Sequence, residues 1–196
     1  EFGPNGGMFV VFRSPAENSQ NQGPNFPGWA ERQVLSGPWE VSFDPRWGGP
    51  KEPVQFDELI NWLDHDEPGV RYYSGKAIYR TTFDLDRVAT DNVLAIELGD
   101  VKDIGMASVL LNGVDLGVVW QPPFRVDVSG TIRQGANELE VTVVNSWRNR
   151  LIRDNALPED QRLTKTNIRV VEEGRHKWHT EDSGLLGPVR IVERTD

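Results

Sequence analysis

The sequence predicts an all-β fold, a two-sheet antiparallel β-sandwich. Apolar and polar residues alternate with the period of a half-buried strand in several short runs, and turn residues separate these runs. Almost no stretch has the period of an amphipathic helix. A chain of 196 residues is long enough for one such domain with a full core.

We expect the chain before residue 37 to lie outside this domain. Residues 8–13 form a short apolar run that predicts a strand, and residues 14–28 are rich in Asn, Gln, Pro and Gly, as linkers and long loops are. We therefore assign residues 1–36 to a linker and an N-terminal strand from an upstream region, and residues 37–196 to the sandwich.

From residue 37 onward, alternation predicts about eight strands. Asn112-Gly113 is the clearest turn, because this dipeptide suits a type I′ hairpin in which both central residues have positive φ. Residues 57–64 could form one or two helical turns, and 158–161 the start of a short helix. The predicted strands are 39–43, 77–85, 92–98, 109–111, 114–120, 124–128, 138–143 and 188–192.

The segment 145–187 has little clean alternation. Connections of this length without regular structure are uncommon in compact domains, and they are usually functional or mobile. We therefore expect a binding surface or an interdomain contact in this segment.

Composition excludes several classes of function. A net charge of -9 argues against nucleic acid as a partner, because that affinity rests on clustered Lys and Arg. The absence of cysteine excludes disulfides, thiolate metal sites and a cysteine nucleophile. No apolar run approaches the roughly 20 residues that cross a bilayer, so we expect no membrane partner.

Acidic residues are abundant in the predicted loops, but no pair is distinguished as the two opposed carboxyl groups that glycoside hydrolysis needs. His176 and His179 could share a metal ion only on a helix, and Gly174 disfavours a helix there. We therefore expect no catalytic residue in this chain.

The seven tryptophans are the more informative group. A sugar is held by an aromatic ring under its C–H face and by planar polar groups at its hydroxyl rim. Trp147 lies in a cluster of such groups that includes Asn145 and Arg148; the alternative is that these two residues hydrogen-bond the backbone of the following loop. The candidate carbohydrate-binding residues are Trp120, Trp147, Arg148 and Asn145, followed by Trp62 and Tyr73.

Two sets of segments carry a resemblance to known families. The segments 107–113, 116–117, 124–128 and 135–145 resemble the jelly-roll, sugar-binding-like domain of family 2 glycoside hydrolases, a fold called galactose-binding-like. With these, the segments 37–41, 72–77, 98–102, 116–120, 149–152 and 183–189 resemble the C-terminal region of the α-L-rhamnosidases of glycoside hydrolase family 106. The resemblance covers most of the chain from Gly37 onward.

This resemblance implies a secreted or periplasmic bacterial enzyme that acts on rhamnose-containing plant glycans. Its catalytic carboxylates would belong to an upstream barrel, for which this chain has neither the length nor the alternation of strands and helices. Some domains of this type carry a structural calcium ion. Asp100 and Asp103 could supply ligands, although no compact loop of alternating oxygen donors surrounds them.

The sequence therefore favours a non-catalytic carbohydrate-binding or accessory module of a larger glycoside hydrolase. Its expected partners are a rhamnose-containing oligosaccharide or polysaccharide and the catalytic domain of the parent enzyme. The alternative is a purely structural domain that packs on the catalytic barrel and binds no sugar. Burial of both Trp120 and Trp147 would favour the alternative.

Overall fold

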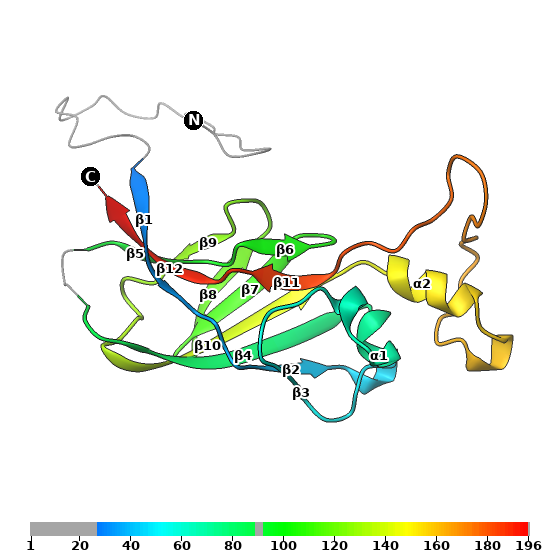
Figure 1. Cartoon of the computed structure of the whole chain (residues 1–196), viewed down its shortest axis with the longest axis horizontal. Helices are drawn as coiled ribbons and strands as arrows, with labels where there is room; N and C mark the ends of the chain where they lie inside the picture. The colour runs from blue at the N-terminus through cyan, green and yellow to red at the C-terminus, as the bar shows by residue number, and fades with distance from the viewer. Residues whose placement is uncertain (1–26, 89–91, 196) are drawn as a thin grey trace, which may run out of the picture.

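The computed structural model describes residues 27–88 and 92–195. Within these residues the chain forms a β-sandwich of antiparallel strands, with few helices (Figure 1). The four-stranded sheet has the order β1 (Gly28–Val34), β12 (Arg190–Thr195), β5 (Leu94–Glu97) and β9 (Arg125–Asp127). The six-stranded sheet has the order β3 (Val54–Phe56), β2 (Trp39–Phe43), β4 (Lys76–Leu85), β10 (Gly135–Val144), β7 (Met106–Leu111) and β8 (Val114–Val119). A small third sheet pairs β11 (Gly184–Gly187) with β6 (Asp100–Lys102).

Alternation within the strands builds the core. In β10, Leu139, Val141 and Val143 are all but fully buried, and the residues between them face outward. The core cluster combines these side chains with those of the four-stranded sheet, such as Ile96 and Ile191. Burying a side chain of this size contributes about 1.5–3 kcal/mol, so the alternation alone fixes which face of each strand points inward. The predicted all-β sandwich is confirmed.

The predicted Asn112-Gly113 hairpin joins β7 to β8. Both residues have positive φ, 52° and 79°, as a type I′ turn requires. A Cβ on Gly113 would meet nothing within 4 Å, so glycine is needed here for its backbone freedom rather than for space. The Asn112 amide also donates to the Thr131 carbonyl oxygen at 2.9 Å and to Asn137 Oδ1 at 3.0 Å. The turn is thereby fixed to the neighbouring loop.

Five short helical elements lie in the connections of the described chain. The longest is α2, which is eight residues long and follows β10 directly. No helix among the described residues is long and apolar enough to cross a bilayer. The five elements are η1 (Pro45–Trp47), η2 (Trp62–Asp64), α1 (Pro68–Arg71), α2 (Arg148–Asn155) and η3 (Glu159–Gln161).

Residues 156–182, which we call the arm, run from the end of α2 back to β11. The arm contains η3 and no strand, and none of its side chains is buried. Figure 1 shows α2 and the arm projecting from one end of the sandwich. The segment that lacks alternation in the sequence is therefore a long excursion of the chain, preceded by a helix that the sequence did not predict.

The domain boundary predicted at residue 37 needs correction. Residues 28–34 form β1, which pairs with β12 from Gly28↔Thr195 to Val34↔Arg190. Leu35 is buried in the core, and its amide donates to the Val189 carbonyl oxygen at 2.8 Å. The sandwich therefore includes residues that we had assigned to the linker. The strand predicted at 8–13 lies outside the described residues.

Candidate functional site

An open cleft of about 640 Å³ lies at the root of the arm. Its walls come from three places in the chain: the end of β6 and the loop after it, the start of α2, and the C-terminal end of the arm. The cleft is thus assembled where the arm leaves and rejoins the sandwich. Its lining residues are Lys102, Asp103, Ser146, Arg148, Leu151, Trp178, Glu181 and Asp182.

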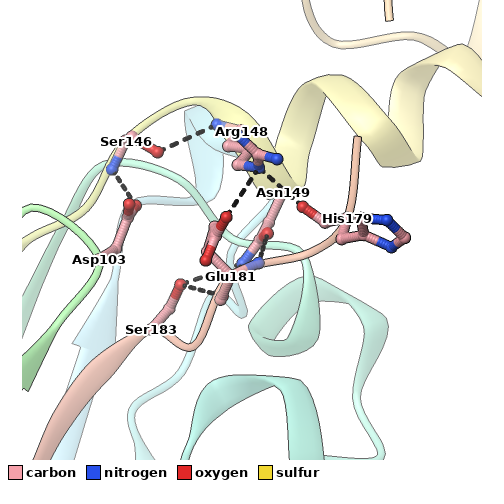
Figure 2. Close-up of polar contacts among 7 residues, drawn as sticks. All are labelled: Asp103, Ser146, Arg148, Asn149, His179, Glu181 and Ser183. Atoms are coloured by element: carbon pink, nitrogen blue, oxygen red, sulfur yellow. Dashed lines mark hydrogen bonds and ion pairs between the residues drawn. The ribbon is translucent and has the colours of Figure 1, made fainter. Parts of the chain in front are cut away.

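The junction between β10 and α2 is fixed to the loop after β6. Asp103, which has a positive φ of 70°, accepts a hydrogen bond from the backbone N–H of Ser146. The Ser146 hydroxyl oxygen in turn accepts from the backbone N–H of Arg148 at 3.3 Å (Figure 2). The second bond satisfies the first amide of α2, which has no partner within the helix. Together, the two bonds fix where the Arg148 side chain begins.

The Arg148 side chain spans the cleft from α2 to the arm. Its Nε donates to the His179 carbonyl oxygen at 2.7 Å and lies 3.3 Å from Glu181 Oε1 (Figure 2). Its guanidinium carbon lies 5.3 Å from the centroid of the Trp178 ring, within cation–π range. Within the described chain, its hydrogen bonds leave from Nε, so the terminal nitrogens are available to a ligand.

A buried amide fixes the C-terminal end of the arm beneath this cleft. Asn149 donates from Nδ2 to the Glu181 carbonyl oxygen at 2.7 Å and to Ser183 Oγ at 3.0 Å. Its Oδ1 accepts from the Glu181 N–H at 2.9 Å. On the other side, Asn61 Nδ2 donates to Asp182 Oδ1 at 2.7 Å. The backbone of this part of the arm is therefore held in one register.

An ion pair anchors α2 itself. Arg150 and Asp154 are both nearly fully buried, and Arg150 Nη1 lies 3.6 Å from Asp154 Oδ1. Burial lowers the pKa of the Arg150 guanidinium, and the Asp154 carboxylate partly offsets that effect. Asp154 Oδ2 also accepts from the backbone N–H of Thr164 at 2.8 Å and from its hydroxyl at 2.6 Å. The pair therefore links the helix to the arm.

The arrangement suits recognition of a polar ligand better than bond cleavage. An aromatic ring, a guanidinium, a lysine and three carboxylates line the open cleft. Each carboxylate already has a protein partner, since Asp103 accepts from Ser146, Glu181 pairs with Arg148 and Asp182 accepts from Asn61. A glycosidase needs one protonated and one ionised carboxyl group facing each other across the sugar.

Of the predicted binding residues, Arg148 lines the cleft and Asn145 lies behind it. Asn145 is 4% exposed, accepts from the Gly75 N–H at 2.8 Å and donates to the Tyr73 carbonyl oxygen at 2.9 Å. Its side chain therefore holds two segments of backbone together. The prediction that Asn145 contacts a ligand is wrong; the alternative, a structural hydrogen-bonding role, describes it.

Trp62 and Tyr73 are also wrong as ligand contacts, because both are fully buried in the core. Trp62 Nε1 donates to the hydroxyl oxygen of Tyr79 at 2.5 Å. The Tyr73 hydroxyl accepts from the Asp44 N–H at 3.0 Å and donates to the Lys76 carbonyl oxygen at 2.8 Å. Their polar atoms are satisfied inside the protein, as buried aromatic residues require.

Trp120 and Trp147 are accessible, at 67% and 42% exposed, but neither lines the cleft. Trp120 borders a separate hollow of about 310 Å³ beyond the end of β8. Trp147 packs edge-on against Trp47, with ring centroids 4.8 Å apart. Neither ring belongs to the core. Burial of both rings would have favoured a purely structural domain, and the structure does not show it.

The structure adds Trp178, Glu181 and Asp182 to the site, which we did not select from the sequence. The long irregular segment was the only signal of these residues in the sequence. It could not show which of them meet, because Arg148 and Trp178 lie 30 positions apart in the chain. From the sequence we expected no cofactor, with Asp100 and Asp103 as the residues that could serve a structural calcium ion; in the structure Asp100 pairs with Lys102 at 3.3 Å. The described residues hold no group of three or more His, Asp and Glu side chains placed for a metal ion.

No protein-family model matches the chain. A curated protein of Formosa agariphila named "Putative beta-glucuronidase" is 38% identical over 181 residues, which is 81% of this chain and 15% of that protein. The solved rhamnosidase of Novosphingobium sp. PP1Y is 34% identical, with a TM-score of 0.79, over 93% of this chain and 17% of that one. The chain matches one domain-sized part of far longer glycoside hydrolases. It spans about a sixth of their length.

More distant structures share the fold alone. A β-glucuronidase from an uncultured Clostridium sp. is 20% identical with a TM-score of 0.53, over 86% of this chain and 30% of that one. The β-sandwich described above is therefore a domain that occurs within glycoside hydrolases. The names of the two more similar relatives specify different sugars, rhamnose in one and glucuronate in the other.

Proposed function

We propose that this chain is a non-catalytic accessory domain of a longer glycoside hydrolase and that it binds a saccharide in the cleft at the root of the arm. The observation that carries the proposal is the Arg148 guanidinium, held over the Trp178 ring and fixed by the His179 carbonyl oxygen and Glu181. A ring beside an oriented fork of donors offers the two surfaces that a sugar requires.

The size and openness of the cleft suit a short saccharide bound weakly. About 640 Å³ falls within the 300–1,000 Å³ range of small-molecule sites. The site is open to solvent, so each hydroxyl bond replaces one made to water and contributes little net free energy. We expect dissociation constants of roughly micromolar to millimolar, because a small ligand in a solvated site has few desolvated contacts.

We further propose that the ligand is rhamnose within a plant glycan and that the parent enzyme is a bacterial α-L-rhamnosidase of glycoside hydrolase family 106, secreted or periplasmic. The 34% identical match to a rhamnosidase supports this choice of sugar. In this proposal the sandwich is of the galactose-binding-like type, and catalysis belongs to another part of the parent polypeptide.

A uronate is the second candidate ligand. The 38% identical relative carries the name of a glucuronidase, and Lys102 and Arg148 place two cations in the cleft. A carboxylate on the sugar would pair with the terminal nitrogens of Arg148. Comparing rhamnose and glucuronate in one experiment separates the two candidates.

The test is calorimetric titration of the chain with rhamnose, a rhamnose-containing oligosaccharide and glucuronate. Trp178→Ala removes the ring from the cleft, and Trp120→Ala is the matched control, since it removes a more exposed ring from a different hollow. We expect Trp178→Ala to weaken binding about 5- to 30-fold, because stacking on a tryptophan contributes on the order of 1–2 kcal/mol. If only Trp120→Ala loses binding, the saccharide binds in the hollow beside Trp120 and not in the cleft. If the unmodified chain binds no saccharide, the domain has a purely structural function.

A further inference from the structure

We propose that the outer face of the six-stranded sheet holds a second binding site, for an uncharged saccharide, in a hollow around Glu40, Arg80 and Glu138. The hollow has a volume of about 550 Å³ and shares no lining residue with the cleft at the root of the arm. The proposal therefore does not rest on saccharide binding in that cleft. It rests on the shape of the hollow, the rigidity of its floor, its free donors and acceptors, and its charge.

A short side chain among long ones creates the hollow. Glu40, Arg80 and Glu140 lie opposite one another on β2, β4 and β10, and all three face away from the core. The next outward residue of β4 is Thr82, which lies opposite Glu138 of β10. Because threonine is much shorter than glutamate or arginine, a depression remains between these neighbours. Its volume falls within the 300–1,000 Å³ range of small-molecule sites.

The floor of the hollow is sheet rather than loop. β4 and β10 pair along ten residues in the middle of the six-stranded sheet. Thr81 Oγ1 donates to the Pro38 carbonyl oxygen at 2.9 Å, and Asn112 Oδ1 accepts from the Glu138 N–H at 3.0 Å. These bonds fix the backbone on both sides of β4. Groups that the fold already holds in place lose little conformational entropy when a ligand binds.

The hollow presents free hydrogen-bond donors beside free acceptors. Arg80 Nε donates to Glu140 Oε2 at 2.8 Å, which orients the guanidinium and leaves its terminal nitrogens without a partner in the described chain. Within the same residues, the carboxylates of Glu40 and Glu138 accept no hydrogen bond. Neighbouring hydroxyl groups of a sugar both donate and accept, so a guanidinium between two carboxylates matches them. Leu110 adds apolar surface beside these groups.

The charge of the hollow selects against charged sugars. Its lining contains three glutamates and one arginine, a net charge of -2. A uronate would be repelled by two carboxylates that have no counterion, and an amine would place its charge against the Arg80 guanidinium. The cleft differs, because Lys102 and Arg148 place two cations there. The hollow therefore suits an uncharged saccharide.

A nitrogen-15 NMR titration of the chain with neutral disaccharides of glucose, galactose, mannose, xylose and rhamnose tests the proposal. We expect at least one of them to give saturable shifts of Arg80 Nε and of the Gly113 and Glu138 amides. The corresponding disaccharides that carry a carboxylate or an amine should bind at least about 3-fold more weakly, because like charges would face each other in the hollow.

Arg80→Met removes the donors at nearly constant size. Arg46→Met is the matched control, because Arg46 also pairs with a surface carboxylate but lines neither the hollow nor the cleft. We expect Arg80→Met to weaken binding about 10-fold and Arg46→Met to leave it unchanged, since hydrogen bonds from a charged group are the strong ones. Both variants should fold, because exposed ion pairs contribute little to stability.

A second variant tests the selection by charge. Glu40→Gln/Glu138→Gln replaces two carboxylates by amides of the same shape and brings the net charge of the lining from -2 to zero. We expect this double variant to bind the neutral and the carboxylate-bearing disaccharide with nearly equal affinity. A preference for the neutral disaccharide that persists unchanged in the double variant would contradict the role given to the two glutamates.

Three results would overturn the proposal: no shift of these signals with any neutral disaccharide at millimolar concentration, equally tight binding of a charged disaccharide by the unmodified chain, and equally tight binding by Arg80→Met. Arg148→Met separates the two sites, since it should alter the signals of the cleft and leave those of the hollow unchanged. Shifts in the cleft alone would remove the second site and leave the proposed function. Shifts in the hollow alone would contradict the proposed function and leave the second site.

Discussion

Tyr79→Phe should be strongly destabilising, although it removes a single oxygen atom. Tyr79 lies on β4 and is fully buried. Its hydroxyl oxygen accepts from Trp62 Nε1 at 2.5 Å and from the Leu185 N–H at 3.2 Å. The two donors belong to η2 and β11, so one phenol joins three elements at the end of the sandwich that carries the arm.

The magnitude follows from the two donors that the substitution leaves without a partner. An unsatisfied buried N–H costs about 1–3 kcal/mol, so two of them lower the expected free energy of unfolding of Tyr79→Phe by about 2–6 kcal/mol. For a domain of this size, about 2–4 °C per kcal/mol gives a melting temperature lower by roughly 4–24 °C. Guanidinium denaturation followed by tryptophan fluorescence measures the loss.

Tyr72→Phe is the matched control. The Tyr72 ring contacts the Arg153 guanidinium, whose central carbon is 5.3 Å from the ring centroid, and within the described chain its hydroxyl has no hydrogen-bond partner. We expect this control to change stability by less than about 0.5 kcal/mol, as surface substitutions usually do. Equal stabilities for the two variants would refute the assignment of Tyr79 as the shared acceptor.

Two further predictions concern the buried ionisable groups. Asp154→Asn should cost about 3–5 kcal/mol, because it leaves the Arg150 charge buried without its counterion, and hydrogen exchange should show earlier opening of Thr164. An unchanged exchange pattern would contradict the role of the pair. Burial raises the pKa of the Tyr79 hydroxyl, so the folded state keeps its proton while the unfolded chain loses it near pH 10. Stability from this group is complete below pH 10 and is lost above it by up to about 1.4 kcal/mol per pH unit, a slope that Tyr79→Phe should reduce in denaturation curves. If stability falls with pH at the same rate in the unmodified chain and in Tyr79→Phe, the raised pKa of the Tyr79 hydroxyl is contradicted.

Sequence reasoning worked where a side chain's neighbours are set by its own strand. The alternation in β4 and β10 and the turn at Asn112-Gly113 follow from local geometry, so β4 was predicted to within one residue of its observed bounds and β10 in its central part. β1 was missed because it is an edge strand without apolar alternation, and the three-residue strands β3 and β6 are too short to show a period.

The candidate site was predicted only in part, because its contacts are not local. Arg148 was found from the ring and amides beside it, but its aromatic partner, Trp178, reaches it only because the arm returns to the sandwich. Trp62 and Tyr73 were misassigned because a tryptophan or tyrosine between strands fits a core as well as a binding site. Only the packing decides between these environments.

The most direct test of the central claim is a nitrogen-15 NMR titration of the chain with a rhamnose-containing oligosaccharide. The account predicts saturable shifts of the Trp178 indole, the Arg148 side chain and the amides of Glu181 and Asp182, with little change at the Trp120 indole. Shifts confined to Trp120 would contradict the assignment of the cleft. An unchanged spectrum at millimolar saccharide would contradict carbohydrate binding by this domain.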